Sequence, residues 1–250
     1  MDLKIKDKTA LVTGASSGIG RGIALALGAE GVRLALVARR GHLLEEVAGE
    51  IVRRKGPKPV LIVQDLMEEA APERIAKAAL EGLGSVEILI NNAGGSRPFK
   101  LGASEALWNE ALTLNFVRQR QLTDRLLDQM IASKRGRIVN ITGKSEPDGV
   151  NGASCAKAAM HSWAKGLSRE VGKFGITVNS IPHGRIHSEQ ILRNYTHEYR
   201  RWQSEHEIPM ARYGEPEDIA NLICFLVSPL AGYITGAVIP VDGGLRRYQF

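Results

Sequence analysis

The stretch Thr9-Ala10-Leu11-Val12-Thr13-Gly14-Ala15-Ser16-Ser17-Gly18-Ile19-Gly20 decides the fold of this chain. Its apolar first part predicts a strand, and the helical pattern that follows it begins at Ile23. The three glycines between them allow a sharp turn, a close approach of a phosphate, and tight packing of the helix on the strand. Free amides at the start of the helix attract anions. The stretch therefore predicts a nucleotide site, although glycines also occur in ordinary turns.

The glycine spacing limits which nucleotide chemistry is expected. The pattern Gly-x-x-x-Gly-x-Gly is one residue longer than the common dinucleotide fingerprint and lacks the lysine of a P-loop, so phosphoryl transfer is not indicated. The residues expected to contact the ligand here are Gly14, Ser16, Ser17, Gly18, Ile19 and Gly20.

Length and composition predict one soluble domain. The chain has 250 residues, of which 44% are hydrophobic, enough for one sizeable core and a single domain over 1–250. No apolar run reaches about 18 residues, and the first eight residues are polar and charged rather than signal-like. We therefore expect a cytoplasmic protein with no membrane segment.

Charge and cysteine content exclude several other classes. The net charge of +6 comes from 33 basic and 27 acidic residues spread along the chain, which does not indicate nucleic-acid binding and suits an anionic small molecule equally well. Cys155 and Cys224 are too few for a disulfide framework and lack zinc-site spacing, so no metal site is expected.

Apolar, β-rich runs alternate with helical patterns along the whole chain. After the first strand, runs of this kind occupy 34–38, 60–63, 88–90, 138–141 and 176–181. Nearly continuous hydrophobic strands require helices on both faces of a parallel sheet. The fold class is therefore α/β, a single doubly wound Rossmann-type domain with a parallel sheet of about seven strands and a ligand crevice at their carboxyl ends. Residues 184–212 form a candidate substrate lid, with a plain surface helix as the alternative.

Several segments together resemble the short-chain dehydrogenase/reductase family, in its 3-oxoacyl-[acyl-carrier-protein] reductase-like form. Besides residues 13–20, they are Asp65-Leu66 after the third strand, Asn91-Asn92-Ala93-Gly94 after the fourth, Asn115 in the next helix, and Lys157 early in the helix after the fifth. These segments occur in the family's order and spacing, and the resemblance covers essentially the whole chain from Lys8 to Gly244.

The resemblance implies a nicotinamide dinucleotide as cofactor. Asp65 and Leu66 would contact the adenine, while Asn92, Ala93 and Gly94 would line the ribose and phosphates. Ser188 matches the hydroxyl that meets the nicotinamide amide, and Lys157 matches the residue that holds the ribose. For Asn91, hydrogen bonds that link strands are at least as good an explanation.

NADP(H) is expected rather than NAD(H). Ala38 stands where a NAD-preferring member would carry an acidic residue, and Arg39 and Arg40 follow it. These guanidinium groups can make charge-assisted bonds to a 2′-phosphate that no carboxylate repels. The alternative is that the two arginines simply begin a solvated helix.

The chain departs from the family at the catalytic centre. The family's tyrosine, four residues before the helix lysine, donates the proton to the carbonyl oxygen, and here Ala153 occupies that position. The serine position after the fifth strand falls on Gly143, with Thr142 or Ser145 as other sources of a hydroxyl. Of the family's proton machinery, Lys157 and Asn115 remain by position.

A histidine enters the loop beside the expected nicotinamide position. His183 lies between Pro182 and Gly184, where the family commonly has proline directly followed by glycine. It is the first replacement acid to consider, ahead of His187, Tyr195 and Tyr199, and a plain loop histidine is the alternative. The candidate catalytic residues are therefore Lys157, Asn115 and His183.

Two functions from different classes remain open. The first is an NADP(H)-dependent oxidoreductase that acts on a carbonyl or alcohol with a non-standard proton donor. The second is a catalytically impaired, nucleotide-binding homologue that acts as a supporting subunit, which the empty position at Ala153 favours. The resemblance also implies a homotetramer, with the long helices over 104–133 and 153–173 at the interface.

Overall fold

A computed structural model describes residues 1–96, 99–143 and 149–247 of the chain. Six parallel strands form one sheet in the order β3-β2-β1-β4-β5-β6. Their bounds are β1 Thr9–Thr13, β2 Arg33–Ala38, β3 Val60–Val63, β4 Ile88–Asn91, β5 Gly136–Thr142 and β6 Ile176–Pro182. These strands confirm the apolar runs found in the sequence and the doubly wound fold class.

The sheet has six strands where the sequence predicts about seven. Residues 236–241 run parallel to β6 in the place of a seventh strand, and Ile239 and Val241 donate backbone hydrogen bonds to Ser180 and Pro182. Between these two bonds the Ile239 carbonyl would accept from residue 182, but Pro182 has no N–H to give. The segment forms isolated bridges with β6, not a regular strand.

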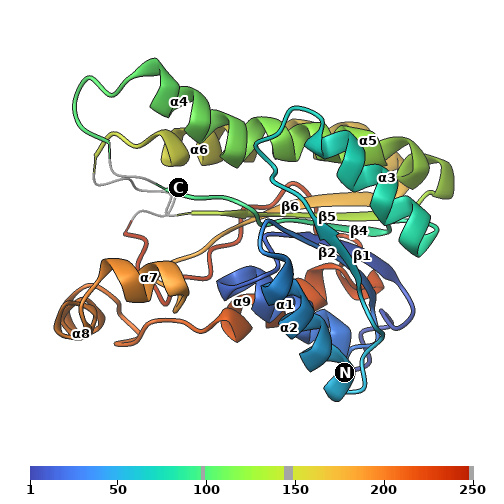
Figure 1. Cartoon of the computed structure of the whole chain (residues 1–250), viewed down its shortest axis with the longest axis horizontal. Coiled ribbons are helices and arrows are strands. Elements are labelled where there is room, and N and C mark those ends of the chain that lie inside the picture. Colours follow the sequence, from blue (N-terminus) through green and yellow to red (C-terminus); the bar gives the residue numbers. More distant parts are fainter. Residues whose placement is uncertain (97–98, 144–148, 248–250) are drawn as a thin grey trace.

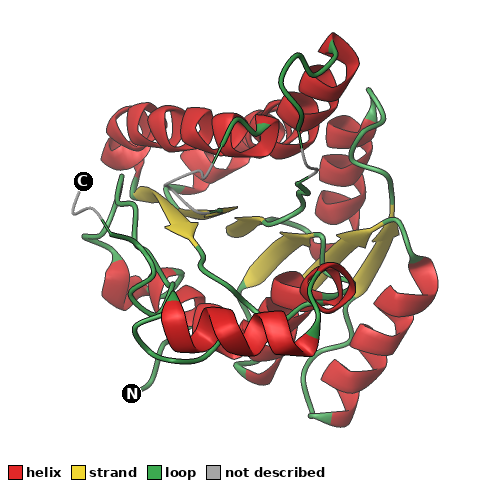
Figure 2. Cartoon of the chain, turned by 90° about the vertical axis from the view of Figure 1, so that its left-hand side faces the viewer, coloured by secondary structure: helices red, strands yellow, loops and turns green. Residues whose placement is uncertain are grey.

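Helices cover both faces of the sheet (Figures 1 and 2). On one face lie α1 Gly18–Ala29, α2 Gly41–Arg53 and α9 Pro216–Leu226. On the other lie α3 Ala71–Leu83, α4 Glu105–Leu112, the π-helical turn η1 Thr113–Val117, α5 Arg118–Ser133 and α6 Gly152–Val171. Two 3₁₀ turns, η2 Gly172–Phe174 and η3 Pro229–Ala231, follow α6 and α9. The layers place all strand-to-helix loops at one edge of the sheet.

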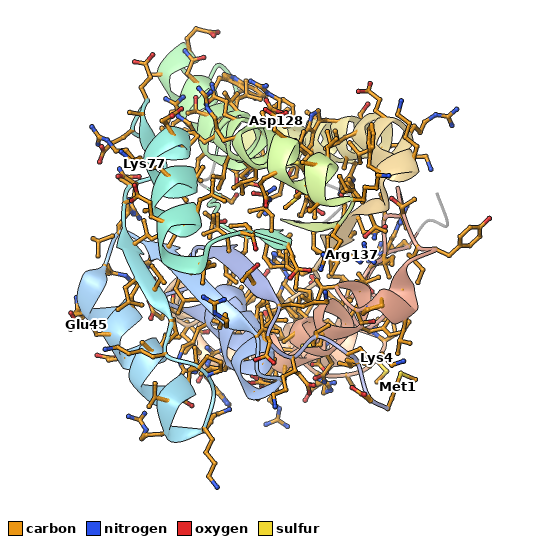
Figure 3. All side chains as sticks on the ribbon, turned by 90° about the vertical axis from the view of Figure 1, so that its right-hand side faces the viewer. Met1, Lys4, Glu45, Lys77, Asp128 and Arg137 are labelled. Atoms are coloured by element: carbon orange, nitrogen blue, oxygen red, sulfur yellow. The ribbon has the colours of Figure 1, made fainter. Side chains whose placement is uncertain are left out.

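The core consists of two apolar clusters, one on each face of the sheet. Val12 packs in the cluster under α1, α2 and α9, while its neighbour Leu11 packs in the cluster under α3, α5 and α6. Successive strand residues point to opposite faces, so continuous apolar strands supply both clusters. Charged residues of the covering helices, such as Glu45, Lys77 and Asp128, lie on the outer surface (Figure 3).

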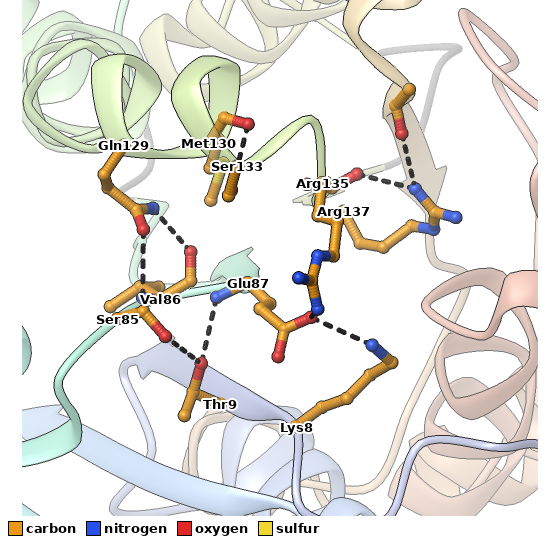
Figure 4. Close-up of polar contacts among 12 residues, drawn as sticks. Lys8, Thr9, Ser85, Val86, Glu87, Gln129, Met130, Ser133, Arg135 and Arg137 are labelled. Carbon is orange, nitrogen blue, oxygen red and sulfur yellow. Dashed lines mark hydrogen bonds and ion pairs between the residues drawn. The ribbon is translucent and has the colours of Figure 1, made fainter.

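The amino ends of the strands are tied together by ion pairs (Figure 4). Glu87, just before β4, accepts from Lys8 at 2.9 Å and lies 3.9 Å from Arg135, just before β5. Its backbone amide donates to Thr9 of β1 at 3.1 Å. These contacts fix the strands at the edge opposite the loops, which leaves the loop edge for function.

Residues 184–212 contain two short helices beyond the carboxyl end of β6. They are α7 Glu189–Asn194 and α8 His197–His206, and Figure 1 shows them apart from the helices that cover the sheet. Thr196 begins α8, and its hydroxyl accepts from Tyr199. Among the described residues, no helix is both long and apolar enough to span a membrane.

Candidate functional site

The strand order reverses at β1, whose neighbours are β2 and β4. The loops that leave β1 and β4 therefore diverge to opposite faces and open a crevice at the carboxyl edge. Thr13, the last residue of β1, holds this crevice together. Its hydroxyl donates to the Ile90 carbonyl at 3.2 Å and accepts from the backbone amides of Asn92 and Ala93, each at 3.0 Å.

Asn92 fixes the glycine turn that follows β1. Its side-chain amide donates to the carbonyls of Thr13 at 2.9 Å and Gly14 at 3.2 Å. Gly14 has a φ of +67°, and a Cβ there would lie 2.9 Å from the Asn92 amide nitrogen. A Cβ at Gly20 would collide with the Gly14 carbonyl. Both glycines are therefore required by the turn itself.

The amino terminus of α1 lies beside the start of α7. Ser17 is its N-cap residue, and its side chain makes no capping bond to the helix. The first amides of α1 are therefore left for an external acceptor. A Cβ at Gly18 would lie 3.1 Å from the Cβ of Ser188, which itself caps α7 by accepting from Ile191 at 3.3 Å. The structure thus brings the predicted residues Gly18 and Ser188 together.

The arginines after β2 lie beside the same loop. Arg40 donates to the Ser17 hydroxyl at 3.2 Å and twice to Glu189 of α7. Arg39 is mostly exposed and lies 3.7 Å from Asp65. Leu66 is buried in the core cluster under α3, so its predicted contact with an adenine stays a prediction.

Asn115 explains the π-helical turn between α4 and α5. Its buried side chain donates to the Ala111 carbonyl at 2.9 Å, the group that a regular helix would bond through the backbone. The same amide exchanges hydrogen bonds with the Gly95 backbone at 3.0 and 3.1 Å. A Cβ at Gly94 would lie 2.8 Å from its Oδ1. Asn115 therefore shapes the loop after β4.

Asn91 links strands, as the alternative explanation predicts. It is fully buried, and its amide donates to Asn140 of β5 at 2.9 Å and to Thr123 of α5 at 3.1 Å. Gln119, also buried, donates to the Ala93 carbonyl and so helps to fix the loop after β4. Asn91 is a structural residue in this arrangement, and the loop residues Asn92, Ala93 and Gly94 face the crevice edge.

Lys157 lies beside Gly143, the predicted serine position. A Cβ at Gly143 would lie 3.5 Å from its Nζ and 3.4 Å from its Cδ, and Ala153 is buried one turn earlier on α6. Burial lowers the pKa of the Lys157 ammonium to about 8. Among the described residues, no side chain or carbonyl accepts a hydrogen bond from it.

The hydroxyl of Thr142 is hydrogen-bonded to His161. Thr142 is fully buried at the end of β5, and its Oγ1 lies 2.7 Å from Nε2 of His161, one turn after Lys157 on α6. Burial first, and then the charges of Lys157 and Arg246, lower the pKa of His161. Ser145, the other hydroxyl considered from the sequence, lies outside the described residues.

His183 lies close to Lys157 at the carboxyl end of β6. Its Nδ1 donates to the Gly184 carbonyl at 2.8 Å, and its Nε2 has no hydrogen-bond partner among the residues that the structure describes. Burial, and next the charge of Lys157, lower the pKa of His183 to about 4. His187 lies 2.7 Å from Glu215, and Tyr195 stacks on Tyr199.

Three residues that build the site were not singled out in the sequence. Thr13 belongs to the quoted motif but has no recognisable role there, because its three bonds depend on the pairing of β1 with β4. Gln119 and His161 lie one turn after Asn115 and Lys157, respectively. This spacing along one helix face is the signal that could have found them.

Comparisons with known proteins agree with this geometry. A family model described as enoyl-(acyl carrier protein) reductase matches residues 14–246. The 3-oxoacyl-[acyl-carrier-protein] reductase FabG of Aquifex aeolicus is 34% identical, with 98% of this chain and 100% of that protein covered. FabG of Staphylococcus epidermidis is 33% identical, with coverage of 96% and 99%.

Solved structures show the same fold over nearly the full length. A 7α-hydroxysteroid dehydrogenase in complex with NADH and 7-oxo glycochenodeoxycholic acid aligns with a TM-score of 0.92 at 29% identity, covering 97% of this chain and 96% of that one. L-sorbose reductase from Gluconobacter frateurii, in complex with NADPH and L-sorbose, aligns with a TM-score of 0.91 at 28% identity, covering 99% and 100%. This chain therefore belongs to the short-chain dehydrogenase/reductase family of NAD(P)-dependent oxidoreductases.

Proposed function

We propose that this protein is an NADP(H)-dependent oxidoreductase that interconverts a small-molecule carbonyl and its alcohol, with a proton donor other than the family's tyrosine. The observation that carries the proposal is the crevice between β1 and β4. Asn92 and Thr13 fix the glycine turn there, and the amino terminus of α1 that follows the turn has no side-chain cap. Such a terminus offers backbone donors to a pyrophosphate. The residues present therefore fit a dinucleotide.

The proposed cofactor contacts extend from the glycine turn to α6. They comprise Gly14, Ser16, Ser17, Gly18, Ile19, Gly20, Arg39, Asp65, Leu66, Asn92, Ala93, Gly94, Lys157 and Ser188. The bound nicotinamide would supply the hydride, while the protein positions the substrate and moves the proton. Asn115 acts through the loop after β4, which it shapes by its bonds to Gly95.

The preference for NADP(H) rests on the end of β2. Ala38 carries no charge there, and Arg39 is the exposed cation after it, with Asp65 at 3.7 Å as a weak partner. A 2′-phosphate is a stronger partner for a guanidinium than this partly exposed carboxylate, because the charge-assisted bonds are shorter and bidentate. The NADPH in L-sorbose reductase and the NADH in the hydroxysteroid dehydrogenase show that similar folds take either cofactor.

Two described groups compete for the role of proton donor, His183 and Lys157. His183 is uncharged near neutral pH because its pKa is about 4, and its Nδ1 proton is held by the Gly184 carbonyl. In this form its free Nε2 accepts a hydrogen bond from a substrate hydroxyl more readily than it donates one. His183 thus suits substrate positioning better than acid catalysis.

A second candidate function is a supporting subunit that binds the nucleotide without turnover. The observation that favours it is the pair Ala153 and Gly143, which supply no hydroxyl at the two positions where the family has tyrosine and serine. Loss of a positioned general acid typically lowers a rate by about 10²- to 10⁴-fold. Such a loss would leave cofactor binding intact.

We further propose a cytoplasmic homotetramer that uses residues 184–212 as a substrate lid. The contact of Ser188 with Gly18 supports the lid, because it places α7 directly over the start of α1. The tetramer rests on resemblance to the family, and α5 and α6 are the helices expected at its interface.

Turnover separates the two functions. NADPH oxidation is measured with a panel of aldehydes, ketones and quinones for the wild-type chain and for Ala153→Tyr, after thermal unfolding has shown that the variant folds. Turnover by the wild-type chain supports the oxidoreductase. Binding of NADPH without turnover, together with activity gained by Ala153→Tyr, would instead establish the supporting subunit.

A further inference from the structure

We propose that Lys157 itself is the proton donor of this enzyme, taking over the role of the side chains that are missing at Ala153 and Gly143. The inference rests on the proposed function, since it deepens the chemistry of the same site. In the family pattern the lysine acts through a tyrosine four residues earlier, whereas here Ala153 stands at that position.

The geometry around Lys157 supports this role. Its Nζ lies 3.5 Å from the point where a Gly143 side chain would begin, so it borders the serine position directly. Ala153, one turn earlier on the same face of α6, contributes only a buried methyl group. Lys157 is thus a proton-bearing group beside the serine position and one helical turn from the tyrosine position.

The neighbouring polar groups are engaged elsewhere. The Thr142 hydroxyl is paired with His161 at 2.7 Å, and Nδ1 of His183 is paired with Gly184 at 2.8 Å. Lys157 Nζ has no acceptor among the described residues, so its N–H bonds are available to ligands. An ammonium has three N–H donors, enough to hold a ribose hydroxyl and to reach a carbonyl oxygen.

The protonation states agree with this division of roles. A group with a pKa of about 8 is about 90% protonated at pH 7, whereas one with a pKa of about 4 is about 0.1% protonated. Lys157 is therefore the better acid near neutral pH, and its pKa lies close to the operating range that acid catalysis requires. Among the described residues, the titratable and charged groups that face this cluster are His161 on α6, His183 and Arg185 after β6, and Arg246.

The proton transfer balances without a further reactant. One N–H bond of Lys157 breaks, its electron pair stays on the nitrogen, and the proton forms the O–H bond of the alcohol. The hydrogen at carbon and the two reducing electrons are what the bound nicotinamide supplies. The neutral amine then regains a proton from solvent. In the oxidation direction, the neutral amine accepts the alcohol proton.

Single-turnover kinetics with saturating NADPH test the assignment. In the wild-type chain we expect the hydride-transfer rate to fall about tenfold per pH unit above the lysine pKa of about 8. Lys157→Arg keeps the positive charge but cannot release a proton near this pH, so its rate should fall about 10²- to 10⁴-fold. Its NADPH affinity, measured by calorimetry, should change by only a few-fold. His183→Gln should keep the alkaline limb of the pH profile, that is, the fall in hydride-transfer rate above pH 8.

A second measurement does not depend on the cofactor. Protein labelled with ¹³C at lysine Cε is titrated by NMR without nucleotide, and one resonance that Lys157→Arg lacks should titrate near pH 8. An unshifted titration near 10.4 would overturn the assignment. So would Lys157→Arg if it kept the rate and the fall in rate above pH 8, or His183→Gln if it lost that fall, whatever its overall rate.

The two proposals fail in different ways. If the folded wild-type chain takes up no NADPH or NADH, the proposed function and the donor assignment fall together. If it binds NADPH and turns over substrate while Lys157→Arg remains equally fast, only the donor assignment falls. Binding without turnover overturns the donor assignment and favours the supporting subunit.

Discussion

Arg40 donates two hydrogen bonds of 3.1 Å to one carboxylate oxygen of Glu189, which follows it by 149 residues in the sequence. The pair joins the loop after β2 to the first residue of α7, and Arg40 also holds the Ser17 hydroxyl. Both side chains are about half exposed. A cofactor phosphate beside Arg40 would therefore compete with Glu189 for the same guanidinium.

Glu189→Gln should strengthen NADPH binding. The substitution frees Arg40 and removes a negative charge near the expected 2′-phosphate, and an exposed pair of this kind is worth about 0.2 to 1 kcal/mol. Calorimetry should show an NADPH affinity about two- to five-fold higher, with little change for NADH. The control is Glu205→Gln, because Glu205 is also a lid carboxylate paired with an arginine, Arg201, at 2.8 Å. Weaker NADPH binding in Glu189→Gln would contradict competition between Glu189 and the phosphate.

Arg39→Ala should lower the affinity for NADPH selectively. A hydrogen bond to a charged group contributes about 1.5 to 3 kcal/mol, so the dissociation constant should rise about tenfold or more for NADPH and remain unchanged for NADH. Arg74→Ala is the matched control, since Arg74 of α3 is similarly exposed and pairs with Glu68, just before that helix. An equal loss of affinity for both cofactors would show that Arg39 does not contact the 2′-phosphate.

Gly94→Ala should destabilise the loop after β4. The new methyl group would lie 2.8 Å from Asn115 Oδ1, which is buried and bonded to Gly95, so either the loop or η1 must shift. We expect a loss of about 1 to 3 kcal/mol in the free energy of unfolding, measured by urea denaturation.

Gly166→Ala provides the control for that prediction. Gly166 lies within α6 with open space around its missing Cβ, and alanine there should stabilise the protein by up to about 1 kcal/mol. Should both substitutions have the same effect, the packing of Gly94 against Asn115 would not matter for stability.

His183 should make the protein less stable in acid. Its pKa is about 4 in the folded state and about 6.5 in the unfolded state, so the unfolded state binds more protons between these values. This contribution is fully present above pH 6.5 and is lost as the pH falls through 4, by about 3 kcal/mol in total. His183→Gln should therefore flatten the fall in unfolding free energy over this window.

The control for the acid prediction is His42→Gln. His42 lies on the exposed surface of α2, and its replacement should leave the slope between pH 6.5 and 4 as it is in the wild-type chain. Denaturant titrations at half-unit pH steps measure both variants. An unchanged slope in His183→Gln would mean that His183 does not stay neutral in the folded protein.

The sequence predicts the fold well because each strand is a continuous apolar run between helical patterns. All six strands lie within two residues of the runs found in the sequence. The seventh strand differs because Pro182 of β6 has no N–H to donate to the Ile239 carbonyl, and pairing with β6 is then limited to isolated bridges. Strand propensity alone does not show which backbone N–H groups are available to pair with the neighbouring strand.

The sequence predicts the parts of the candidate site that consist of motifs at the ends of consecutive strands. The structure brings the glycine turn beside Asn92 and Ser188, and the contacts of all three with a cofactor stay predictions. The role of Thr13 was not predictable, because it depends on which strands become neighbours at the switch point. The low pKa of His183 likewise depends on burial beside Lys157, which no local sequence pattern specifies.

Isothermal titration calorimetry of the folded wild-type chain with NADPH and with NADH tests the central claim most directly. The account predicts that both nucleotides bind in the crevice between β1 and β4, with NADPH binding at least several-fold more tightly. Uptake of neither nucleotide, or tighter binding of NADH than of NADPH, would contradict it.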